Sequence, residues 1–552
     1  MRCSWAFCIL VFGIPAFAAV NCPVAPDGPT SEARQAFLLR NFDKAIALDQ
    51  ATLAHSPNDP DALAGIVESL LREEKIDDAV AAAQKAQQAN PHNAVVLTAL
   101  ADAQYRAGMP WKAIQSLHDA LTADPCYARA HLGYARIARI ESFYATASQE
   151  ARTAHTLDPH DPEIRSDWIW TLPTADRIRE LQDYLRSPSG DDPEDVRHMR
   201  QLLDFMQRSA SEPHKACRLV SATTSTEFPF AYLMEDSEHI RAFGLKVRLN
   251  GQAAQLQIDT GAGGIVVSRS VAERAGLKAV SQTDMGGIGS QGFKPGYTAY
   301  ADSIRVGDLE FQDCAVRVLD SRSVVDQDGL IGMDVFSDFL VTLDYPMRKM
   351  TLGPLPPRPG ELAAPATLRS DPSSGNAPGD PASNAPASSA AAPAAHGPFD
   401  RYTAPAMKNW SPIYRVGHEL LLPVTLDRKT TRLFILDTGA WSTTITPEAA
   451  REVTKLHSAD GELEVRGLSG KVKDVFYADK LTLYFANLSQ PAEQVPAFDL
   501  SSLSRNTGME VSGLIGANTI DLTTLDIDYR DGLIHFDYRA NRGYMHTPGH
   551  QD

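Results

Sequence analysis

The tetrapeptide Asp-Thr-Gly-Ala occurs twice in the chain, at 259–262 and at 437–440. An aspartate can donate or accept a proton, so a duplicated aspartate is a candidate for general acid–base chemistry. A single copy would be a modest signal, because Asp and Gly also favour ordinary turns. Whether the pair indicates acid–base chemistry therefore depends on the sequence around each copy.

Three further landmarks follow both copies in the same order. They are Tyr-Ala-Asp at 300–302 and 477–479, Leu-Ile-Gly at 330–332 and 514–516, and Asp-Tyr at 344–345 and 528–529. A matched series of this kind is hard to explain by chance, so it predicts two duplicated lobes.

Each motif follows alternating apolar and polar residues, the pattern of a half-buried β-strand. In the first copy the alternation over 245–249 leads into Asn250-Gly251, a strong hairpin signal, and a second strand over 255–258 then reaches the motif. In the second copy the alternation over 422–426 is followed by a turn at 427–429. Both aspartates are therefore expected at the end of the second strand of a hairpin.

These motifs and their β-rich setting resemble the retropepsin-like aspartic peptidases. The resemblance covers 240–355, here called lobe 1, and 412–540, here called lobe 2, and it implies an all-β fold for each. A glycine-rich stretch after the first motif looks like the family's flap, and a weaker candidate follows the second motif. The flap residues implied are Gly286, Gly287, Ile288 and Gly289 in lobe 1, and Gly467 and Gly470 in lobe 2.

In this family each lobe carries one catalytic aspartate and two lobes complete a site. The resemblance therefore implies an endopeptidase with Asp259 and Asp437 as its catalytic pair. Two neighbouring carboxylates share one proton, so the ionised one can activate water while the protonated one polarises the peptide carbonyl. This chemistry needs no metal or organic cofactor. The substrate would be an extended peptide or protein segment that pairs its backbone under the flap.

The resemblance also assigns supporting roles in the two active-site loops. The threonines would hydrogen-bond across the lobe interface, and the glycines would allow close approach of backbone to carboxylate or of one loop to another. These residues are Thr260, Gly261 and Gly332 in lobe 1, and Thr438, Gly439 and Gly516 in lobe 2.

Two alternatives stay open. Either lobe could pair with its twin from another chain, which would give sites with two copies of Asp259. The chain could instead be a non-catalytic peptide-binding or scaffold protein of the cell envelope. The presence of both aspartates favours the enzyme.

A 34-residue period marks the N-terminal part of the chain. It places small or helix-ending residues at fixed intervals: Pro57, Pro91, Pro125 and Pro159, and Ala45, Ala79, Ala113 and Ala147. The pattern resembles the tetratricopeptide repeat (TPR) over about residues 30–165, as four helix pairs of an α-helical solenoid. Such arrays commonly bind a protein partner in a concave groove, and the alternative is that this array only packs against the rest of the chain. Residues 166–235 are expected to form a helical cap or connector, with a helix near 194–208.

The N-terminal segment predicts an exported protein. Residues 1–18 have a basic start, an apolar stretch and a small-residue site at Ala16-Phe17-Ala18, as signal peptides do, and no later segment predicts a membrane span.

The net charge of -17 argues against nucleic acid as a partner. A Pro/Ala/Ser-rich linker over 356–400 is expected to be disordered.

Four cysteines remain beyond the signal segment: Cys22, Cys126, Cys217 and Cys314. Their spacing fixes no pairing, and no Cys/His cluster predicts a metal site. An oxidising compartment permits disulfides, but buried or free thiols are the favoured expectation.

Overall fold

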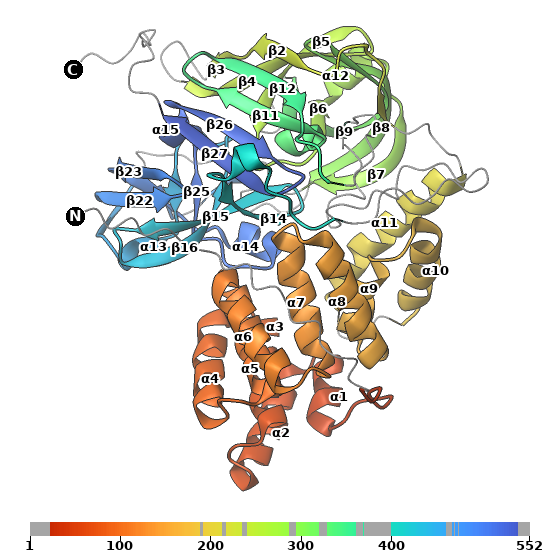
Figure 1. Ribbon diagram of the computed structural model, residues 1–552, viewed down its shortest axis with the longest axis vertical. Coiled ribbons are helices and arrows are strands. Elements are labelled where there is room, and N and C mark those ends of the chain that lie inside the picture. Colours follow the sequence, from red (N-terminus) through yellow and green to blue (C-terminus); the bar gives the residue numbers. More distant parts are fainter. Residues whose placement is uncertain are drawn as a thin grey trace.

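A computed structural model describes residues 22–187, 191–211, 217–234, 240–285, 294–319, 328–359, 368, 399–459, 466–467, 470–472 and 474–538. Helices occupy one end of the molecule and two β lobes the other (Figure 1). The predicted fold class, a helical array followed by two all-β lobes, is confirmed. The predicted signal segment, the first flap stretch at 286–289 and most of the linker lie outside the described residues.

The helical domain contains four antiparallel helix pairs. They are α1 (Glu32–Leu38) with α2 (Phe42–His55), α3 (Pro60–Arg72) with α4 (Ile76–Ala89), α5 (Ala94–Arg106) with α6 (Pro110–Ala123), and α7 (Ala128–Ile140) with α8 (Tyr144–Leu157). The second helices begin at residues 42, 76, 110 and 144, which keeps the 34-residue period. Ala79 and Ala113 are fully buried, because a small side chain lets neighbouring helices approach closely.

Two disulfides correct the expectation of free thiols. Cys22 is bonded to Cys126 just before α7, and Cys217 is bonded to Cys314 in lobe 1. The first bond ties the N-terminal segment across the helix ends, where the Ala25 amide also donates to the Leu157 carbonyl at 2.8 Å. Each disulfide therefore joins segments about 100 residues apart, which spacing alone could not reveal.

The connector expected over 166–235 is helical only in its first part. Three helices follow the repeats: α9 (Pro162–Ile169), α10 (Thr174–Tyr184) and α11 (Pro193–Ser211). Three strands then join the β sheets instead of capping the array: β1 (Arg218–Leu219), β2 (Thr226–Pro229) and β3 (Ala231–Met234). The β part of the chain thus begins before the boundary predicted from the sequence.

Lobe 1 is built on a nine-stranded sheet. Its elements are β4 (Ile240–Leu249), β5 (Gln252–Asp259), β6 (Ile265–Ser268), α12 (Arg269–Arg274), β7 (Ala279–Met285), β8 (Lys294–Val306), β9 (Leu309–Leu319), β10 (Gly329–Gly332), η1 (Met333–Phe336), β11 (Phe339–Asp344) and β12 (Lys349–Pro354). The strand order is β1-β9-β6-β10-β5-β4-β8-β7, and β3 pairs with β4.

Lobe 2 repeats this plan in a ten-stranded sheet. Its first elements are η3 (Pro405–Met407), β13 (Ser411–Pro412), β14 (Tyr414–Val416), β15 (Glu419–Leu426), β16 (Thr430–Leu436), β17 (Thr444–Ile445), α13 (Pro447–Arg451), β18 (Leu456–Ser458), β19 (Arg466–Gly467) and β20 (Gly470–Lys471). The rest are β21 (Phe476–Ala478), β22 (Leu481–Phe485), β23 (Leu488–Ala492), β24 (Val495–Ala497), α14 (Ser501–Thr507), β25 (Gly513–Ile515), α15 (Ala517–Ile520), β26 (Thr523–Asp528) and β27 (Leu533–Tyr538).

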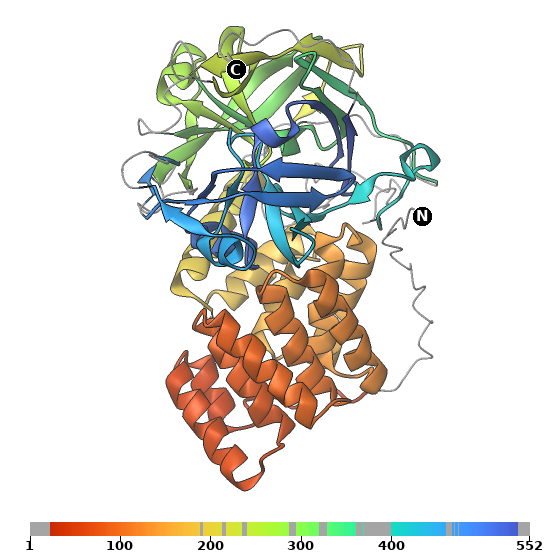
Figure 2. The same ribbon diagram turned by 90° about the vertical axis from the view of Figure 1, so that its left-hand side faces the viewer.

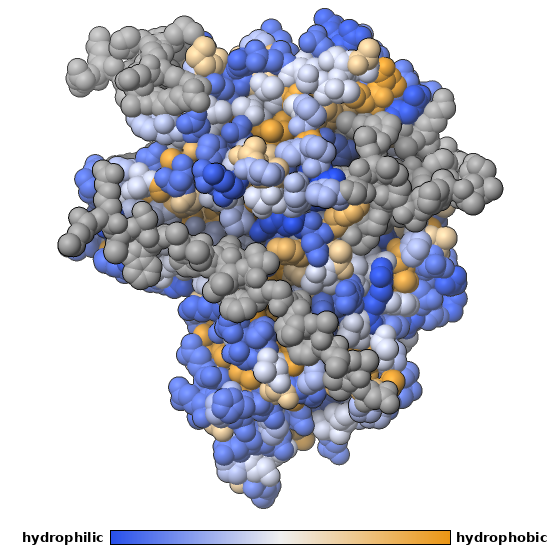
Figure 3. All heavy atoms as spheres, in the orientation of Figure 1, coloured by the Kyte–Doolittle hydropathy of each residue, from blue (hydrophilic) through white to orange (hydrophobic). Residues whose placement is uncertain are grey.

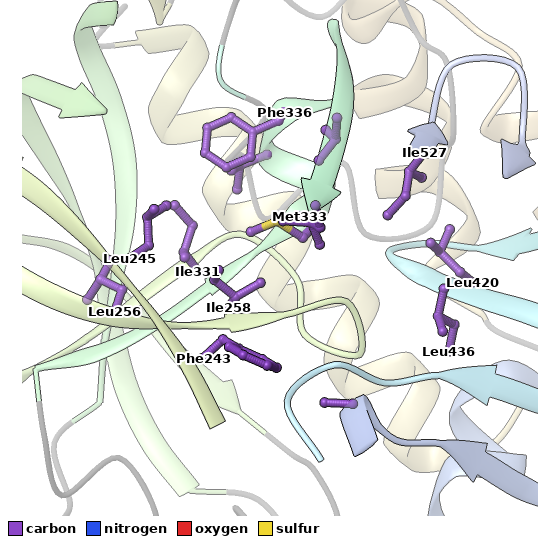
Figure 4. Close-up of a cluster of buried hydrophobic side chains, with 14 of the residues drawn as sticks. Phe243, Leu245, Leu256, Ile258, Ile331, Met333, Phe336, Leu420, Leu436 and Ile527 are labelled. Atoms are coloured by element: carbon purple, nitrogen blue, oxygen red, sulfur yellow. The ribbon is translucent and has the colours of Figure 1, made fainter. Parts of the chain in front are cut away.

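A third sheet joins the two lobes. Its order is β13-β27-β26-β11-β12-β2, and the antiparallel pair β11–β26 crosses from one lobe to the other. The hydrophobic core is continuous beneath it: Figure 4 shows Ile258, Ile331 and Met333 of lobe 1 facing the side that carries Leu436 and Ile527 of lobe 2. Backbone pairing and apolar burial therefore fix the two lobes against each other within one chain.

The helical domain packs on lobe 2. Ile140 of α7 belongs to the same apolar cluster as Leu421 and Leu433, and the Glu510 amide donates to the Arg106 carbonyl at 2.8 Å. Asp400, at the end of the predicted linker, accepts from the Thr146 amide and hydroxyl at 2.9 and 2.8 Å. Figure 2 shows from the side that the helical domain lies below the two lobes, next to lobe 2.

The surface is mostly polar on the face drawn in Figure 3. Hydrophilic residues cover much of the helical domain there, and hydrophobic ones form small separate patches over the lobes. Among the described helices, none combines the length and the apolar character that crossing a membrane requires.

Candidate active site

Both aspartates are delivered by the predicted hairpins. In lobe 1, Leu249 pairs with Gln252 across a two-residue turn, and Asn250 and Gly251 take the positive φ angles (48° and 81°) that such turns need. In lobe 2, β15 and β16 form the equivalent hairpin, which ends one residue before Asp437. The same backbone device thus presents one carboxylate from each lobe.

The Leu-Ile-Gly segments run parallel to the aspartate-bearing strands. Gly332 of β10 lies opposite Asp259, and the Asp437 amide donates to the Ile515 carbonyl at 3.0 Å. A Cβ atom on Gly332 would overlap the Ala262 carbonyl, and one on Gly516 would overlap the backbone at Ser442. These contacts agree with the close passage expected of both glycines.

The two threonines cross-link the active-site loops. The Thr260 amide donates to the Thr438 hydroxyl at 3.1 Å, and the Thr438 amide donates to the Thr260 hydroxyl at 3.0 Å. The Thr260 hydroxyl also donates to the Leu436 carbonyl at 2.6 Å. Both threonines are at most 1% exposed, so these hydrogen bonds form where water cannot compete.

The carboxylates lie over the glycines of the opposite lobe. A Cβ on Gly261 would sit 3.0 Å from Asp437 Cγ, and one on Gly439 would overlap the Asp259 carboxyl group. Each carboxylate also accepts a backbone N–H from its own loop, Gly261 to Asp259 at 2.8 Å and Gly439 to Asp437 at 2.9 Å. The Ala440 amide adds a second donor to Asp437 at 3.0 Å.

Burial changes the proton affinity of both groups. It raises the pKa of Asp259 well above its usual value, and the charge of Asp437 raises that pKa further. Burial also raises the pKa of Asp437, to about 6, against the lowering effect of hydrogen bonds from Ala440, Gly439 and the Asp259 carboxyl. The structure therefore brings the two aspartates together in a site that favours one retained proton.

Residues 245–335 match the family model for aspartyl protease. The matched segment covers most of lobe 1, including the Asp-Thr-Gly-Ala and Leu-Ile-Gly motifs. No curated protein matches the chain. Among solved structures, a thermophilic TPR protein from Thermus thermophilus matches with 20% identity over 32% of this chain and 95% of that chain, at a TM-score of 0.26. A likeness with a TM-score this low adds no evidence for the repeat fold, which is seen in the helix pairs themselves.

In lobe 1, the first flap candidate at 286–289 falls between β7 and β8 in the sequence and lies outside the described residues. In lobe 2, the second flap candidate is a short hairpin in which Gly467 pairs with Gly470. The lobe 2 segment therefore belongs to an antiparallel pair, and the flap role of both segments stays a prediction.

Sequence reasoning missed a third acid beside the two aspartates. Glu419 is 7% exposed, and its charge raises the pKa of both Asp259 and Asp437. No motif marks it, and the only sequence signal is a charged residue directly before the apolar run 420–422. Its neighbour His418 lies against Gly263 of lobe 1, where a side chain on the glycine would collide with the imidazole ring.

Proposed function

We propose that this protein is an exported aspartic endopeptidase that hydrolyses peptide bonds with Asp259 and Asp437. The observation that carries the proposal is the pair of carboxyl groups, half-buried Asp259 from lobe 1 and buried Asp437 from lobe 2, in loops held by reciprocal threonine hydrogen bonds. The aspartyl protease match over 245–335 supports the peptidase class. The substrate is a peptide or protein segment in extended form.

The proton assignment follows from the unequal surroundings of the dyad. Asp259 has the more strongly raised pKa and keeps the shared proton, so Asp437 is the general base once the pH exceeds about 6. Asp437 takes a proton from water as the oxygen attacks the peptide carbonyl. Protonated Asp259 hydrogen-bonds the carbonyl oxygen, and a proton then passes to the departing amine nitrogen.

Export is supported by two independent features. The N-terminal 18 residues have the order of basic, apolar and small residues that signal peptidases recognise. Both disulfides suit an oxidising compartment, and Cys22 would lie near the new N-terminus after cleavage. Cell fractionation and N-terminal sequencing of the mature chain test this part; an intact Met1 on cytoplasmic protein would contradict it.

The helical domain is proposed to support lobe 2 and to recruit a partner or substrate. Its helices are cross-braced, since Arg129 of α7 pairs with Glu68 of α3 at 3.0 Å and with Asp161 before α9 at 3.0 Å. Ion pairs of this kind stiffen the array. That a partner or substrate binds in a groove of this helical array stays a prediction.

The central experiment is digestion of a denatured protein mixture by the full chain and its Asp259→Asn and Asp437→Asn variants. Each variant should lose at least about 100-fold in rate, because neither carboxyl group alone can hold the shared proton and act as base. The matched control is Asp302→Asn, an exposed lobe 1 aspartate in the Tyr-Ala-Asp landmark, which should retain full activity. Undiminished cleavage by both dyad variants would exclude this mechanism.

The same experiment separates the two modes of lobe pairing. The β11–β26 strand pair and the Thr260–Thr438 hydrogen bonds join the two lobes of one chain, so we expect both substitutions to be equally damaging. Loss of cleavage in only one variant would instead indicate sites made from identical lobes of two chains. Sedimentation of the active species then shows whether a single chain is sufficient.

A further inference from the structure

The third acid beside the dyad has an unusual environment. Glu419 opens β15, and its Oε2 atom is buried without a hydrogen-bond partner among the described residues. Its other oxygen lies 3.4 Å from His418 Nε2. A buried carboxylate oxygen without a partner is costly, so such a residue calls for a role other than stability.

Glu419 has no counterpart in lobe 1. Leu421 pairs with Ile435, two residues before Asp437, and Gly244 pairs with Gln257, two residues before Asp259. The strands therefore align Glu419 with Ala242 of lobe 1. The two lobes present the same backbone to the dyad, but at this position lobe 2 has a carboxylate and lobe 1 a methyl group.

His418 opposes that charge from the next position. Its ring faces lobe 1 at Gly263, and its charge lowers the pKa of Asp259 while that of Glu419 raises it. Two other charged groups of lobe 1 face His418, namely Asp334, which accepts from the Gly264 amide, and Arg317, which donates to the Gly263 carbonyl. The imidazole is 35% exposed, so bulk solvent can exchange its proton.

We propose that Glu419 and His418 act as a pair of positioning residues that sets the pH range in which the Asp259–Asp437 dyad holds a single proton. The inference rests on the proposed peptidase function and concerns its regulation. Glu419 moves the active range toward neutral pH, and protonated His418 limits that displacement. Neither residue is required to touch the substrate.

The two substitutions have opposite expected signs. Glu419→Gln removes a negative charge, so ionising the dyad becomes easier and both limbs of the pH–rate profile move to lower pH. His418→Gln removes a positive charge and exposes the dyad to Glu419 alone, so the limbs move to higher pH. Shifts of about half a unit to one unit are expected for charges at this range in a partly buried site. On the alkaline limb they correspond to roughly three- to tenfold changes in kcat/KM.

The experiment is a set of pH–rate profiles on one peptide substrate. The matched control is Glu493→Gln, which removes the same charge from an exposed glutamate of lobe 2 that pairs with Lys480, and it should leave the profile in place. Opposite shifts in the two variants support the inference. Coincident profiles, or shifts in the same direction, overturn it.

A second readout does not need catalysis. Titration of the Asp259 and Asp437 carboxyl carbons by NMR, in protein labelled with carbon-13 at aspartate, reports the same opposite shifts directly. Asp259→Asn identifies its own resonance. Shifted titrations in a chain that cleaves nothing would keep this inference and reject the peptidase function. Unshifted titrations in an active enzyme would do the reverse, and His418→Gln decides the case if Glu419→Gln does not fold.

Discussion

The two lobes share a backbone plan and differ in what surrounds it. Each carries its aspartate at the end of a hairpin, beside a parallel Leu-Ile-Gly strand. Lobe 1 is braced by the Cys217–Cys314 disulfide, whereas lobe 2 is braced by the helical domain packed on it. Duplication has thus preserved the device that positions the carboxylate, while stabilisation of each lobe has diverged.

The two lobes also differ in the residues that surround the two aspartates. The residue after Asp-Thr-Gly-Ala is Gly263 in lobe 1 and Trp441 in lobe 2, and the tryptophan ring lies 5.8 Å from that of Phe243. Glu419 likewise stands where lobe 1 has Ala242. A symmetric backbone with asymmetric neighbours gives two chemically equal carboxyl groups different proton affinities, which is what an acid and a base in one site require.

The largest expected difference between the lobes is in their bracing. Replacing the lobe 1 disulfide with Cys217→Ala/Cys314→Ala should lower the free energy of unfolding by about 3 to 4 kcal/mol, since the bond closes a long loop. Denaturant titration measures the loss. Unfolding of lobe 2 and of the helical domain in the same sample serves as the internal reference. An unchanged midpoint would show that lobe 1 does not depend on this bond.

The glycines of the two active loops should tolerate substitution unequally. Gly439→Ala places a methyl group on the Asp259 carboxyl and should reduce kcat/KM by about 100-fold. Gly261→Ala meets Asp437 at 3.0 Å and should cost only about tenfold. Peptide hydrolysis measures both; equal losses would contradict the asymmetry of the two loops.

The dyad should make the folded protein less stable as the pH rises. A carboxyl group whose pKa is raised on folding binds more protons in the native state, so its contribution is lost as the pH increases through the folded pKa. For Asp437 that pKa is about 6, against a usual 3.8. Between pH 5 and pH 8 this group should lower the free energy of unfolding by roughly 1 to 2 kcal/mol. Asp437→Asn should flatten the dependence in thermal melts; a slope of the opposite sign would refute the burial argument.

The smallest difference concerns the threonines. The Thr260 hydroxyl both donates to Leu436 and accepts from Thr438, whereas the Thr438 hydroxyl accepts from Thr260. Thr260→Val should therefore destabilise the chain by about 2 kcal/mol and Thr438→Val by about 1 kcal/mol. Paired denaturant curves can resolve this, and the reverse order would show that the cross-link is held chiefly from lobe 2.

Features that depend on neighbouring or regularly spaced residues were predictable from the sequence. The hairpin at Asn250-Gly251 follows from local turn chemistry, and the 34-residue spacing of Ala79 and Ala113 follows from helices that repeat the same contact. The expected helix near 194–208 is present as α11, Pro193–Ser211, for the same reason. In each case the residues that decide the structure are close in the chain or regularly spaced.

The sequence by itself determined the helix pairs, the two hairpins and the identity of the two candidate acids. Only the tertiary structure decided that Cys22 meets Cys126, that the strands from Arg218 onward join the β sheets, and that Glu419 lies beside the dyad. The physical reason is range. Turn preference and periodicity act between near neighbours, whereas a disulfide, a sheet edge and the field at a buried carboxylate depend on segments that meet only after the chain has folded.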